Sequence, residues 1–378
     1  MLEGPIGAAS FNNEFGRPNI VGYFRNFEIK NPVDGRWRGY HKPIMLAGGM
    51  GSINDIHTRK QDTQAGDYVI VLGGPAMLIG LGGGAASSVS SADGQEELDF
   101  ASVQRGNPEM QRRCQEVINR CWYQGQDSPI RSIHDVGAGG LSNAIPEILD
   151  DAGLGGDIEL RRLQIDHVSM SPMEIWCNES QERYVLSIKP EQLEDFKALC
   201  QQERCPVAIM GQATAEQTLR VRDELLNQDP VHIPMDLLFG NTPQTEINIK
   251  TRAIGRQRFE PQLNDLSQAI EQVLSFPTVA SKQYLITIGD RTVTGLVHRD
   301  QMVGPWQVPV ADCGITLRDY DGFAGEAMAV GERTPLALLN PAASARMAVS
   351  EALTNLAGSG LRDLSLVKLS ANWMTASG

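Results

Sequence analysis

The sequence lacks the signatures of several common protein classes. None of its six cysteines forms a C-x-x-C pair, and its six histidines do not cluster with them, so a zinc site is not expected. A G-x-x-x-x-G-K-[ST] stretch is also missing, which excludes a P-loop. No apolar run approaches the length of a membrane span, and the first residues lack the basic and apolar segments of a signal peptide. Neither membrane insertion nor secretion is therefore expected.

Positive charge is also in short supply. The 378 residues include 33 Lys and Arg against 46 Asp and Glu, a net charge of -13. A general nucleic-acid surface is therefore not expected, and phosphates would be bound by backbone N–H groups, a few placed cations and a metal ion. With 41% hydrophobic residues, the chain has enough apolar material for two or more domains without a disulfide scaffold. Reduced thiols and a cytoplasmic location follow as expectations.

A glycine cluster in residues 69–88, "VIVLGGPAMLIGLGGGAASS", raises the question of a dinucleotide site. Gly80, Gly82 and Ala85 fit the G-x-G-x-x-[GA] spacing, and Asp99 lies about where a ribose contact belongs. The glycines do not lead into a helix, however, because serine, β-branched and turn residues follow them. A Rossmann site is therefore not expected. The alternatives are a surface loop, which this stretch alone favours, or a close backbone approach to an anion.

From Gly66 to about Lys250 the pattern alternates strands and helices, which predicts an α/β or α+β domain. The expected strands are "DYVIVLGG", "RSIHDVGAGG", "ERYVLSIK", "PVAIMGQAT" and "LRVRD", and the expected helices are "NPEMQRRCQEVINRCW", "LSNAIPEILDDA" and "PEQLEDFKALCQQE". Asn107 suits the N-cap of the first helix and Pro108 its first position. Residues at helical spacing in it are expected in the core: Met110, Cys114, Val117, Ile118 and Cys121.

Residues 227–262 are polar and irregular, which indicates a domain boundary. A second domain is expected to follow, with a helix at "DLSQAIEQVLS", strands at "QYLITIG" and "RTVTGLVH", and a helix from about Ala342 to Ala357 that Asn340 caps. The first sixty or so residues are rich in glycine and asparagine and carry short extended pieces, such as "NIVGYFRNFEI" and "KPIMLAGG".

Two stretches offer oxygen atoms at the edge of the first domain. Asp135 follows His134 at the end of a buried strand and precedes a glycine loop, where a carboxylate suits Mg²⁺ beside a phosphate. A loop cap and a satisfied histidine are an equally good interpretation. Glu179, Ser180 and Gln181 precede another strand and suit a substrate amide or hydroxyls, although an ordinary turn is the better interpretation of those three residues alone.

The second domain offers a similar set. Glu351 and Asn355 lie four residues apart and therefore share one helix face, which with Asp312 would make a three-oxygen magnesium site. Lys282, before an expected strand, suits a phosphate as a point charge. On spacing alone, a solvated helix face and a solvated lysine are the favoured interpretations.

Taken together, these stretches resemble one family along essentially the whole chain. They are, in order, "EGPIGAASFNNEFGRP", "GGGAASS", "VQRGNPEMQRR", "IHDVGAGGLSNAIPE", "NESQERYVL", "TVASKQYLI", "VADCGITLRDYDGFAGEAMAVGERTPLALLNPAASARMAVSEALTNLAG" and "LSANWM". The family is the long form of phosphoribosylformylglycinamidine synthase (FGAR amidotransferase). The resemblance implies PurM-like lobes of the aminoimidazole ribonucleotide synthetase type. Residues 1–64 would end a first N-type lobe, 65–250 would form a complete C-type lobe, and 251–378 would begin a second N-type lobe.

The resemblance also implies a ligase that forms a C–N bond in purine biosynthesis. ATP would activate the amide oxygen of formylglycinamide ribonucleotide, and ammonia from glutamine would then displace phosphate. It assigns residues as follows: substrate contacts at Gln104, Glu179, Ser180 and Gln181; magnesium ligands at Asp135, Asp312, Glu351 and Asn355; nucleotide contacts at Val21, Gly22, Tyr23 and Ala311; and an active-site lysine at Lys282. ATP or ADP and Mg²⁺ are the expected cofactors.

The resemblance further implies that the chain is an internal fragment of the synthetase and is inactive alone. The glutaminase domain, the upstream catalytic histidine and a further magnesium carboxylate would lie outside it. The full-length protein would be a monomer without nucleic-acid or membrane partners. Two alternatives stay open: a shorter synthetase of the same superfamily, such as aminoimidazole ribonucleotide or selenophosphate synthetase, and a non-catalytic segment whose nucleotide site supports folding.

Overall fold

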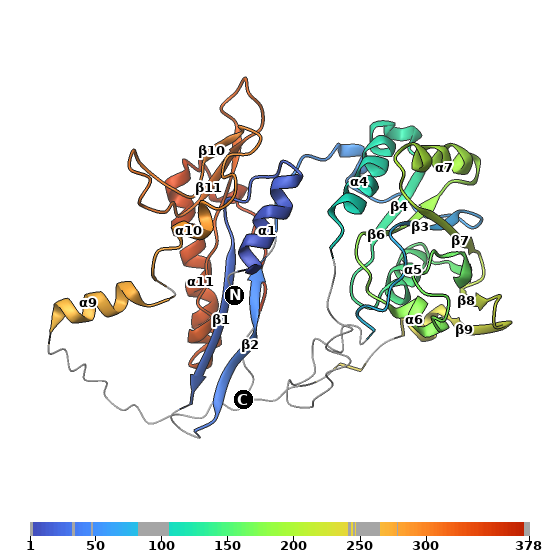
Figure 1. Ribbon diagram of the computed structural model, residues 1–378, viewed down its shortest axis with the longest axis horizontal. Coiled ribbons are helices and arrows are strands. Elements are labelled where there is room, and N and C mark those ends of the chain that lie inside the picture. Colours follow the sequence, from blue (N-terminus) through green and yellow to red (C-terminus); the bar gives the residue numbers. More distant parts are fainter. Residues whose placement is uncertain are drawn as a thin grey trace. The chain divides into compact units, whose positions relative to one another are not determined.

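A computed structural model describes residues 3–31, 35–46, 48–81, 106–240, 243–244, 246, 265–277 and 279–373 (Figure 1). The chain divides into two compact units, one of residues Gly51–Thr251 and one that joins Met1–Met50 to Arg252–Gly378. Gln104 and most of the glycine–serine stretch after Leu81 lie outside the described residues.

The Gly51–Thr251 unit is built on a seven-stranded sheet with the order β4-β6-β3-β7-β5-β8-β9. Its strands are β3 (Tyr68–Gly73), β4 (Ile130–Asp135), β5 (Gly155–Glu159), β6 (Arg183–Ile188), β7 (Val207–Thr214), β8 (Thr218–Asp223) and β9 (Gln228–Pro234). All neighbours are antiparallel except β5 and β8. The helices are α4 (Pro108–Tyr123), α5 (Leu141–Asp150), α6 (Pro172–Cys177), α7 (Leu193–Gln202) and α8 (Met235–Leu238). The α/β content and the expected strand and helix positions are thereby confirmed.

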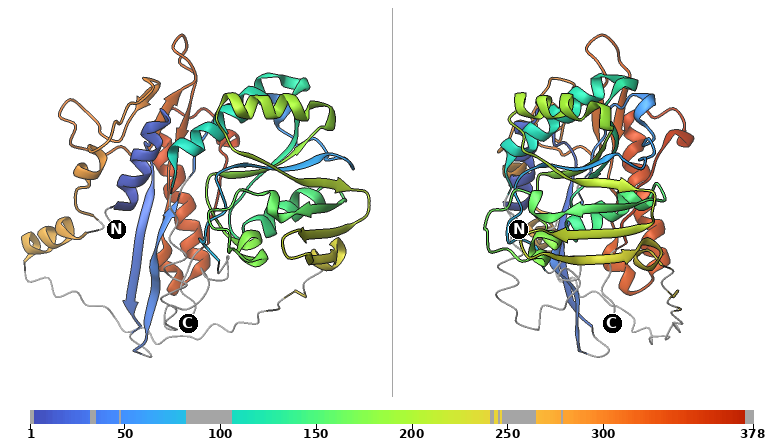
Figure 2. Two further views of the ribbon diagram at one scale, coloured as in Figure 1. Left: turned by 45° about the vertical axis from the view of Figure 1, so that its right-hand side comes forward. Right: turned by 90° about the vertical axis from the view of Figure 1, so that its right-hand side faces the viewer.

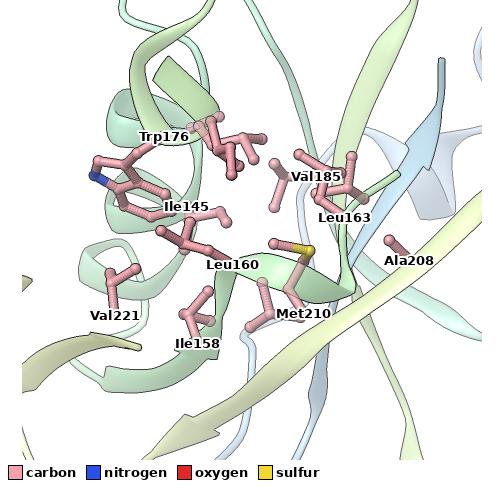
Figure 3. Close-up of a cluster of buried hydrophobic side chains, with 14 of the residues drawn as sticks. Ile145, Ile158, Leu160, Leu163, Trp176, Val185, Ala208, Met210 and Val221 are labelled. Carbon is pink, nitrogen blue, oxygen red and sulfur yellow. The ribbon is translucent and has the colours of Figure 1, made fainter. Parts of the chain in front are cut away.

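Both faces of this sheet are covered, which explains the continuous apolar run of β3. Val69 and Val71 point into one core, which contains α5 and α6, whereas Ile70 and Leu72 point into a second core beneath α4 and α7. Figure 2 shows helices on both faces of the sheet, and Figure 3 shows side chains of the first core. A strand with both faces buried reads as an unbroken hydrophobic run because alternation no longer separates core from solvent.

Helix α4 begins as its sequence predicts. The side chain of Asn107 accepts a hydrogen bond from the Met110 N–H at 3.1 Å, and Pro108 occupies the first turn. The expected core residues Cys114, Val117 and Cys121 are fully buried. Burial raises the pKa of Cys121 to about 12, so this thiol stays protonated and packs as a small apolar side chain. The six cysteines form no disulfide.

The other unit contains a long hairpin, a small sheet and several helices. Its elements are α1 (Glu3–Glu14), β1 (Tyr23–Lys30), β2 (Trp37–Leu46), α9 (Leu266–Ser275), α10 (Gln283–Ile286), β10 (Val297–Arg299), β11 (Gly314–Leu317), β12 (Gly325–Met328) and α11 (Pro341–Leu356). Strands β1 and β2 pair antiparallel with a bulge between Arg25 and Phe27, and β10, β11 and β12 form an antiparallel sheet in that order. Asn340 caps α11 through a 2.9 Å bond from the Ala343 N–H, as expected.

Three sequence expectations are wrong. Part of the stretch "QYLITIG" forms the short helix α10 rather than a strand, and of "RTVTGLVH" only Val297 and His298 lie in a strand, β10. Within the irregular 227–262 stretch, residues Gln228–Pro234 form β9 because they find a partner strand in β8. Helix α1 covers residues to which the sequence analysis assigned no element, and its Gly4 packs closely against the ring of Phe24.

No helix in the described part of the chain is both long and apolar enough to cross a bilayer.

A buried ion pair beside the first core gives the unit a defined dependence on pH. Nη2 of Arg161 lies 2.6 Å from Oδ2 of Asp223, whose side chain is fully buried, and hydrogen bonds from Arg161 lower the pKa of this carboxyl below its ordinary value of 3.8. The carboxylate therefore stabilises the fold fully above the pKa of the unfolded state, about 3.9. That contribution is lost as the pH falls through the lower folded-state pKa.

We expect Asp223→Asn to lower the free energy of unfolding at pH 7 by about 3 kcal/mol, because it removes the buried carboxylate that pairs with the half-buried Arg161. Urea unfolding of both proteins between pH 7 and pH 3 measures this. The difference between their free energies of unfolding should shrink below pH 4, because the carboxylate of Asp223 takes up a proton in the unfolded wild type first. A difference that is constant down to pH 3 would contradict the assignment.

Candidate functional site

The antiparallel order of the sheet brings three loops to one edge. Asp135 at the end of β4 pairs with Tyr184 near the start of β6, and Gly73 at the end of β3 pairs with Arg183. The loops that leave β3 and β4 therefore meet the loop that enters β6. This is how Asp135 and Glu179–Gln181, far apart in the sequence, come to the same place.

The glycine loop between β4 and α5 needs its glycines. Gly139 and Gly140 have φ of 81° and 62°, a region that side chains disfavour. A Cβ at Gly140 would lie 2.1 Å from the carbonyl oxygen of Asn178. Helix α5 therefore begins directly against the loop that enters β6, without a side-chain cap at Gly140.

The carboxylate of Glu179 joins the loops. Its Oε1 accepts a 2.9 Å hydrogen bond from the Gly139 N–H, and its own N–H donates to the carbonyl of Ile79 at 2.8 Å. Gly80 passes so close that an added Cβ would lie 2.5 Å from Cβ of Glu179. Gln181 donates from Nε2 to the carbonyl of Glu179 at 2.8 Å. Both side chains remain half-buried, so part of each is exposed at the edge of the sheet.

Ser180 lies differently from its two neighbours. Its side chain is fully buried, and Oγ accepts a 2.9 Å hydrogen bond from the Met77 N–H and donates to Oδ1 of Asn178 at 2.7 Å. The hydroxyl is therefore fully hydrogen bonded within the protein. The substrate contact assigned to Ser180 stays a prediction, and it would have to come from the backbone of this residue.

The side chains of Asp135 and His134 have different environments in the structure. The Asp135 side chain is exposed beside the glycine loop, 3.8 Å from where a Cβ of Gly137 would lie. The ring of His134 is engaged at both nitrogens, by the Asp135 carbonyl oxygen at 2.7 Å from Nδ1 and by the carboxylate of Glu147 at Nε2. His134 is thus a satisfied residue, whereas the carboxylate of Asp135 is accessible to a cation.

The sequence analysis missed the buried polar residues of the loop that enters β6. Asn178 and Arg183 are almost completely buried. Oδ1 of Asn178 accepts a hydrogen bond from the Ser180 N–H, and Nη2 of Arg183 donates to the Asn178 carbonyl. Burial also raises the pKa of the Glu182 carboxyl. All three belong to the "NESQER" stretch, whose density of polar side chains directly before a buried strand was the available signal.

In the other unit, the expected nucleotide contacts are connected through Gln301. Its backbone carbonyl accepts a 2.8 Å hydrogen bond from the Ala311 N–H, and its side-chain amide donates to the carbonyl of Asn19. Gly314 also packs on Ile20, with 2.7 Å between an added Cβ and Cδ1. The segment that leads into Val21, Gly22 and Tyr23 therefore lies beside the segment that carries Ala311 and Asp312.

The expected magnesium ligands on α11 face a neighbouring loop. Oε2 of Glu351 accepts a 2.9 Å bond from the Glu332 N–H and forms a 2.7 Å ion pair with Arg333. Asn355 donates from Nδ2 to the carbonyl of Val330 at 3.0 Å, which leaves its Oδ1 as the possible ligand atom. Asp312 is exposed. Within the described ranges, no group of three or more His, Cys, Asp or Glu side chains is placed to hold a metal ion.

Lys282 is not connected to these residues by any hydrogen bond or ion pair in the described part of the chain. It lies at the start of α10 and donates from Nζ to the carbonyl of Ala280.

Comparison with known proteins defines the class first. Residues 64–224 match the model of the C-terminal domain of AIR synthase related proteins. Residues 281–378 match the model of the FGAR-AT PurM_N-like domain. The two matches and the observed architecture confirm the expected PurM-like fold.

Solved structures show the same fold. The structure of Thermotoga maritima PurL complexed with FGAR is 20% identical, with a TM-score of 0.64 over 94% of this chain and 52% of that one. PurLQS from the same organism is 19% identical, with a TM-score of 0.63 over 93% of this chain and 51% of that one. The structure of T. maritima PurL complexed with ATP is 19% identical, with a TM-score of 0.59 over 94% of this chain and 50% of that one.

The two domain matches confirm the resemblance of the sequence to the FGAR amidotransferase (phosphoribosylformylglycinamidine synthase) family, whose PurM_N-like domain is the one matched by residues 281–378. The chain spans about half the length of the T. maritima PurL structures that it matches.

The tight approach of α5 to the loop that enters β6 predicts a strong effect of one methyl group on stability. Gly140→Ala should lower the free energy of unfolding by about 1 to 3 kcal/mol, because the left-handed φ is strained and the Cβ meets the Asn178 carbonyl. Gly137→Ala is the matched control, since its Cβ meets only Asp135 at 3.8 Å, and should change stability by less than about 0.5 kcal/mol. Equal effects of the two substitutions in urea unfolding would contradict this packing.

Proposed function

We propose that this chain is a synthetase segment that binds formylglycinamide ribonucleotide and ATP on the route to formylglycinamidine ribonucleotide. In the proposed reaction, the terminal phosphoryl group of ATP is transferred to the amide oxygen of the substrate, releasing ADP. The nitrogen lone pair of ammonia then attacks the amide carbon, and phosphate leaves with the former amide oxygen. Splitting the substitution in this way replaces a poor leaving group by a good one.

The observation that carries this proposal is the convergence of Asp135, Glu179 and Gln181 at one edge of the sheet. Glu179 is held by the Gly139 N–H through one oxygen, so its other oxygen is available to accept from a substrate N–H. The amide of Gln181 is half-buried and donates one N–H to the Glu179 carbonyl, and its second N–H and its Oε1 offer a donor and an acceptor. Such paired groups suit an amide or ribose hydroxyls, which need a donor and an acceptor at fixed separation.

Asp135 is the proposed magnesium ligand at this edge. Its carboxylate is exposed and lies beside the glycine loop, a position that suits a metal ion bound to phosphate oxygens. When bound, Mg²⁺ would neutralise charge on the phosphates during transfer. The protein's part is to hold the carboxylate at the end of a rigid strand, which leaves little conformational entropy to be lost on binding.

The remaining assignments complete the proposal. Gln104 is proposed to contact the substrate, Lys282 to act in the active site, and a glutaminase to supply ammonia from glutamine. We further propose the cytoplasm as the compartment, in keeping with six free thiols, and a monomer as the state of the full-length protein.

A second nucleotide site is proposed in the other unit, at Val21–Tyr23, Ala311, Asp312, Glu351 and Asn355. One observation favours a structural role for it: Glu351 is already paired with Arg333 and hydrogen bonded to the Glu332 N–H. A carboxylate held in this way ties α11 to its neighbouring loop whether or not a nucleotide is present. The alternative function, a nucleotide site that stabilises the fold without turnover, rests on this contact.

The substrate site is tested with Glu179→Gln. Replacing the carboxylate by an amide removes a charge-assisted hydrogen bond to the substrate while the Gly139 N–H keeps an acceptor. Calorimetric titration with formylglycinamide ribonucleotide should show binding about tenfold weaker, or about 1.4 kcal/mol. The control is Glu194→Gln on α7, which removes an exposed charge that pairs only with Lys197 and should leave the Kd unchanged. Equal Kd values for wild type and Glu179→Gln would refute the assignment.

The second site is tested with ADP. Binding of ADP to the purified chain should be tighter with Mg²⁺ than without it, and Asp312→Asn should abolish the difference because an amide oxygen is a weaker ligand for Mg²⁺ than a carboxylate. Asp321→Asn, which changes another exposed carboxylate of the same unit, is the control and should keep the Mg²⁺ dependence. A Mg²⁺ dependence that survives in Asp312→Asn would exclude Asp312 as the ligand.

A further inference from the structure

A buried arginine lies under the loop that carries the proposed substrate contacts. This loop, residues 178–182, is called the substrate loop below. Arg183 is the first residue of β6, and its side chain is only 2% exposed. Its Nε donates to the carbonyl of Ser180 at 2.9 Å. Its Nη2 donates to the carbonyl of Asn178 at 2.9 Å and to Oδ1 of the same residue at 2.8 Å. One guanidinium thus binds three oxygens on either side of Glu179.

This arginine is buried without a counter-charge in the described part of the chain. No carboxylate there forms an ion pair with it, and its Nη1 is buried without an acceptor. Burial lowers the pKa of Arg183 to about 10, so the group remains a cation at neutral pH. Burying a charge that only backbone and amide oxygens compensate is costly. The hydrogen bonds from Arg183 to the oxygens of the loop offset part of this desolvation free energy.

The buried contacts extend from Arg183 through Asn178 to two other segments. Asn178 donates from Nδ2 to the carbonyls of Glu174 and Ile175, at 2.7 and 2.8 Å, which ends helix α6. Its Oδ1 also accepts from Ser180 Oγ, which in turn holds the Met77 N–H. The end of α6, the loop into β6 and the loop after β3 are therefore tied together at one buried point.

We propose that Arg183 is the positioning residue of the substrate loop. By binding the carbonyl groups of Asn178 and Ser180, it fixes the backbone on both sides of Glu179, so that the carboxylate is aimed at the Gly139 N–H and at the substrate amide. Arg183 itself touches no ligand, since its side chain is buried. This inference rests on the proposed function, in which Glu179 and Gln181 contact formylglycinamide ribonucleotide.

The planar fork of arginine is what the arrangement requires. Two of its nitrogens reach the carbonyl groups of two residues at once, with fixed separation and direction. The ammonium of a lysine is a single centre on a flexible stem and cannot reproduce both bonds. Arg183→Lys therefore keeps the charge and removes the geometry, which separates positioning from simple electrostatic attraction of a phosphate.

The test compares Arg183→Lys with Arg161→Lys in the same purified chain. Arg161 is a half-buried arginine of the same unit, but it contacts Asp223 and the Met170 carbonyl rather than the substrate loop. Amide hydrogen exchange is followed in peptides covering residues 178–182, and the Kd for formylglycinamide ribonucleotide is measured by calorimetry. We expect Arg183→Lys to speed exchange in this segment at least tenfold and to weaken binding at least tenfold. Arg161→Lys should change neither by more than twofold.

Each outcome decides the question. If wild type binds and Arg183→Lys binds equally well, or exchanges at the wild-type rate in residues 178–182, the positioning role is wrong while the proposed function stands. If wild type does not bind, the proposed function fails and the substrate role of the loop fails with it. Should Arg183→Lys not fold, Asn178→Ala, which removes the Oδ1 acceptor, is judged by the same two measurements and the same thresholds.

Discussion

The site depends on one constraint of the sheet, the position of β6 between two strands that run against it. Because β3 and β4 both pair with β6 in antiparallel register, their last residues lie beside its first ones. Every contact at the site follows from this register, including Glu179 on the glycine loop and Arg183 beneath the loop. A shift of β6 by one residue would turn Arg183 to the opposite face of the sheet and expose residues that now fill the core.

The sequence predicts the local part of this fold well because its signals are local. Asn107 and Asn340 cap helices as their positions indicate, and the β-branched run of β3 forms a buried strand. Strand β9 escaped prediction because most of its residues are exposed and two are prolines, so it depends on its pairing with β8 rather than on full burial. The stretch "QYLITIG" illustrates the ambiguity of a short apolar run, which suits a buried strand and a helical turn equally.

The site itself was predictable only in part. Glu179, Gln181 and Asp135 follow from the resemblance and lie together, but residue types alone favour a turn at the first two. The density of polar residues in "NESQER" does not single out Arg183, because an arginine at the start of a strand is ordinarily a solvated residue. The importance of Arg183 comes from burial under a loop, which only the register with β3 brings about. A comparison with Arg161 shows the difference: that arginine has Asp223 as its buried partner, whereas Arg183 holds carbonyl groups.

The same reasoning applies to the proposed second nucleotide site, where the carboxylate of Glu351 already has an ion-pair partner in Arg333. Glu351 can join a magnesium ion only through the oxygen that Arg333 does not hold, or by giving up that ion pair. Gly331 brings the neighbouring loop so close to α11 that an added Cβ would lie 2.0 Å from the Ala348 carbonyl, so the loop cannot withdraw without unpacking the helix. A nucleotide bound here would therefore add to contacts that exist without it. Such a site gains stability from its ligand by mass action and offers little freedom for the rearrangements of a catalytic cycle.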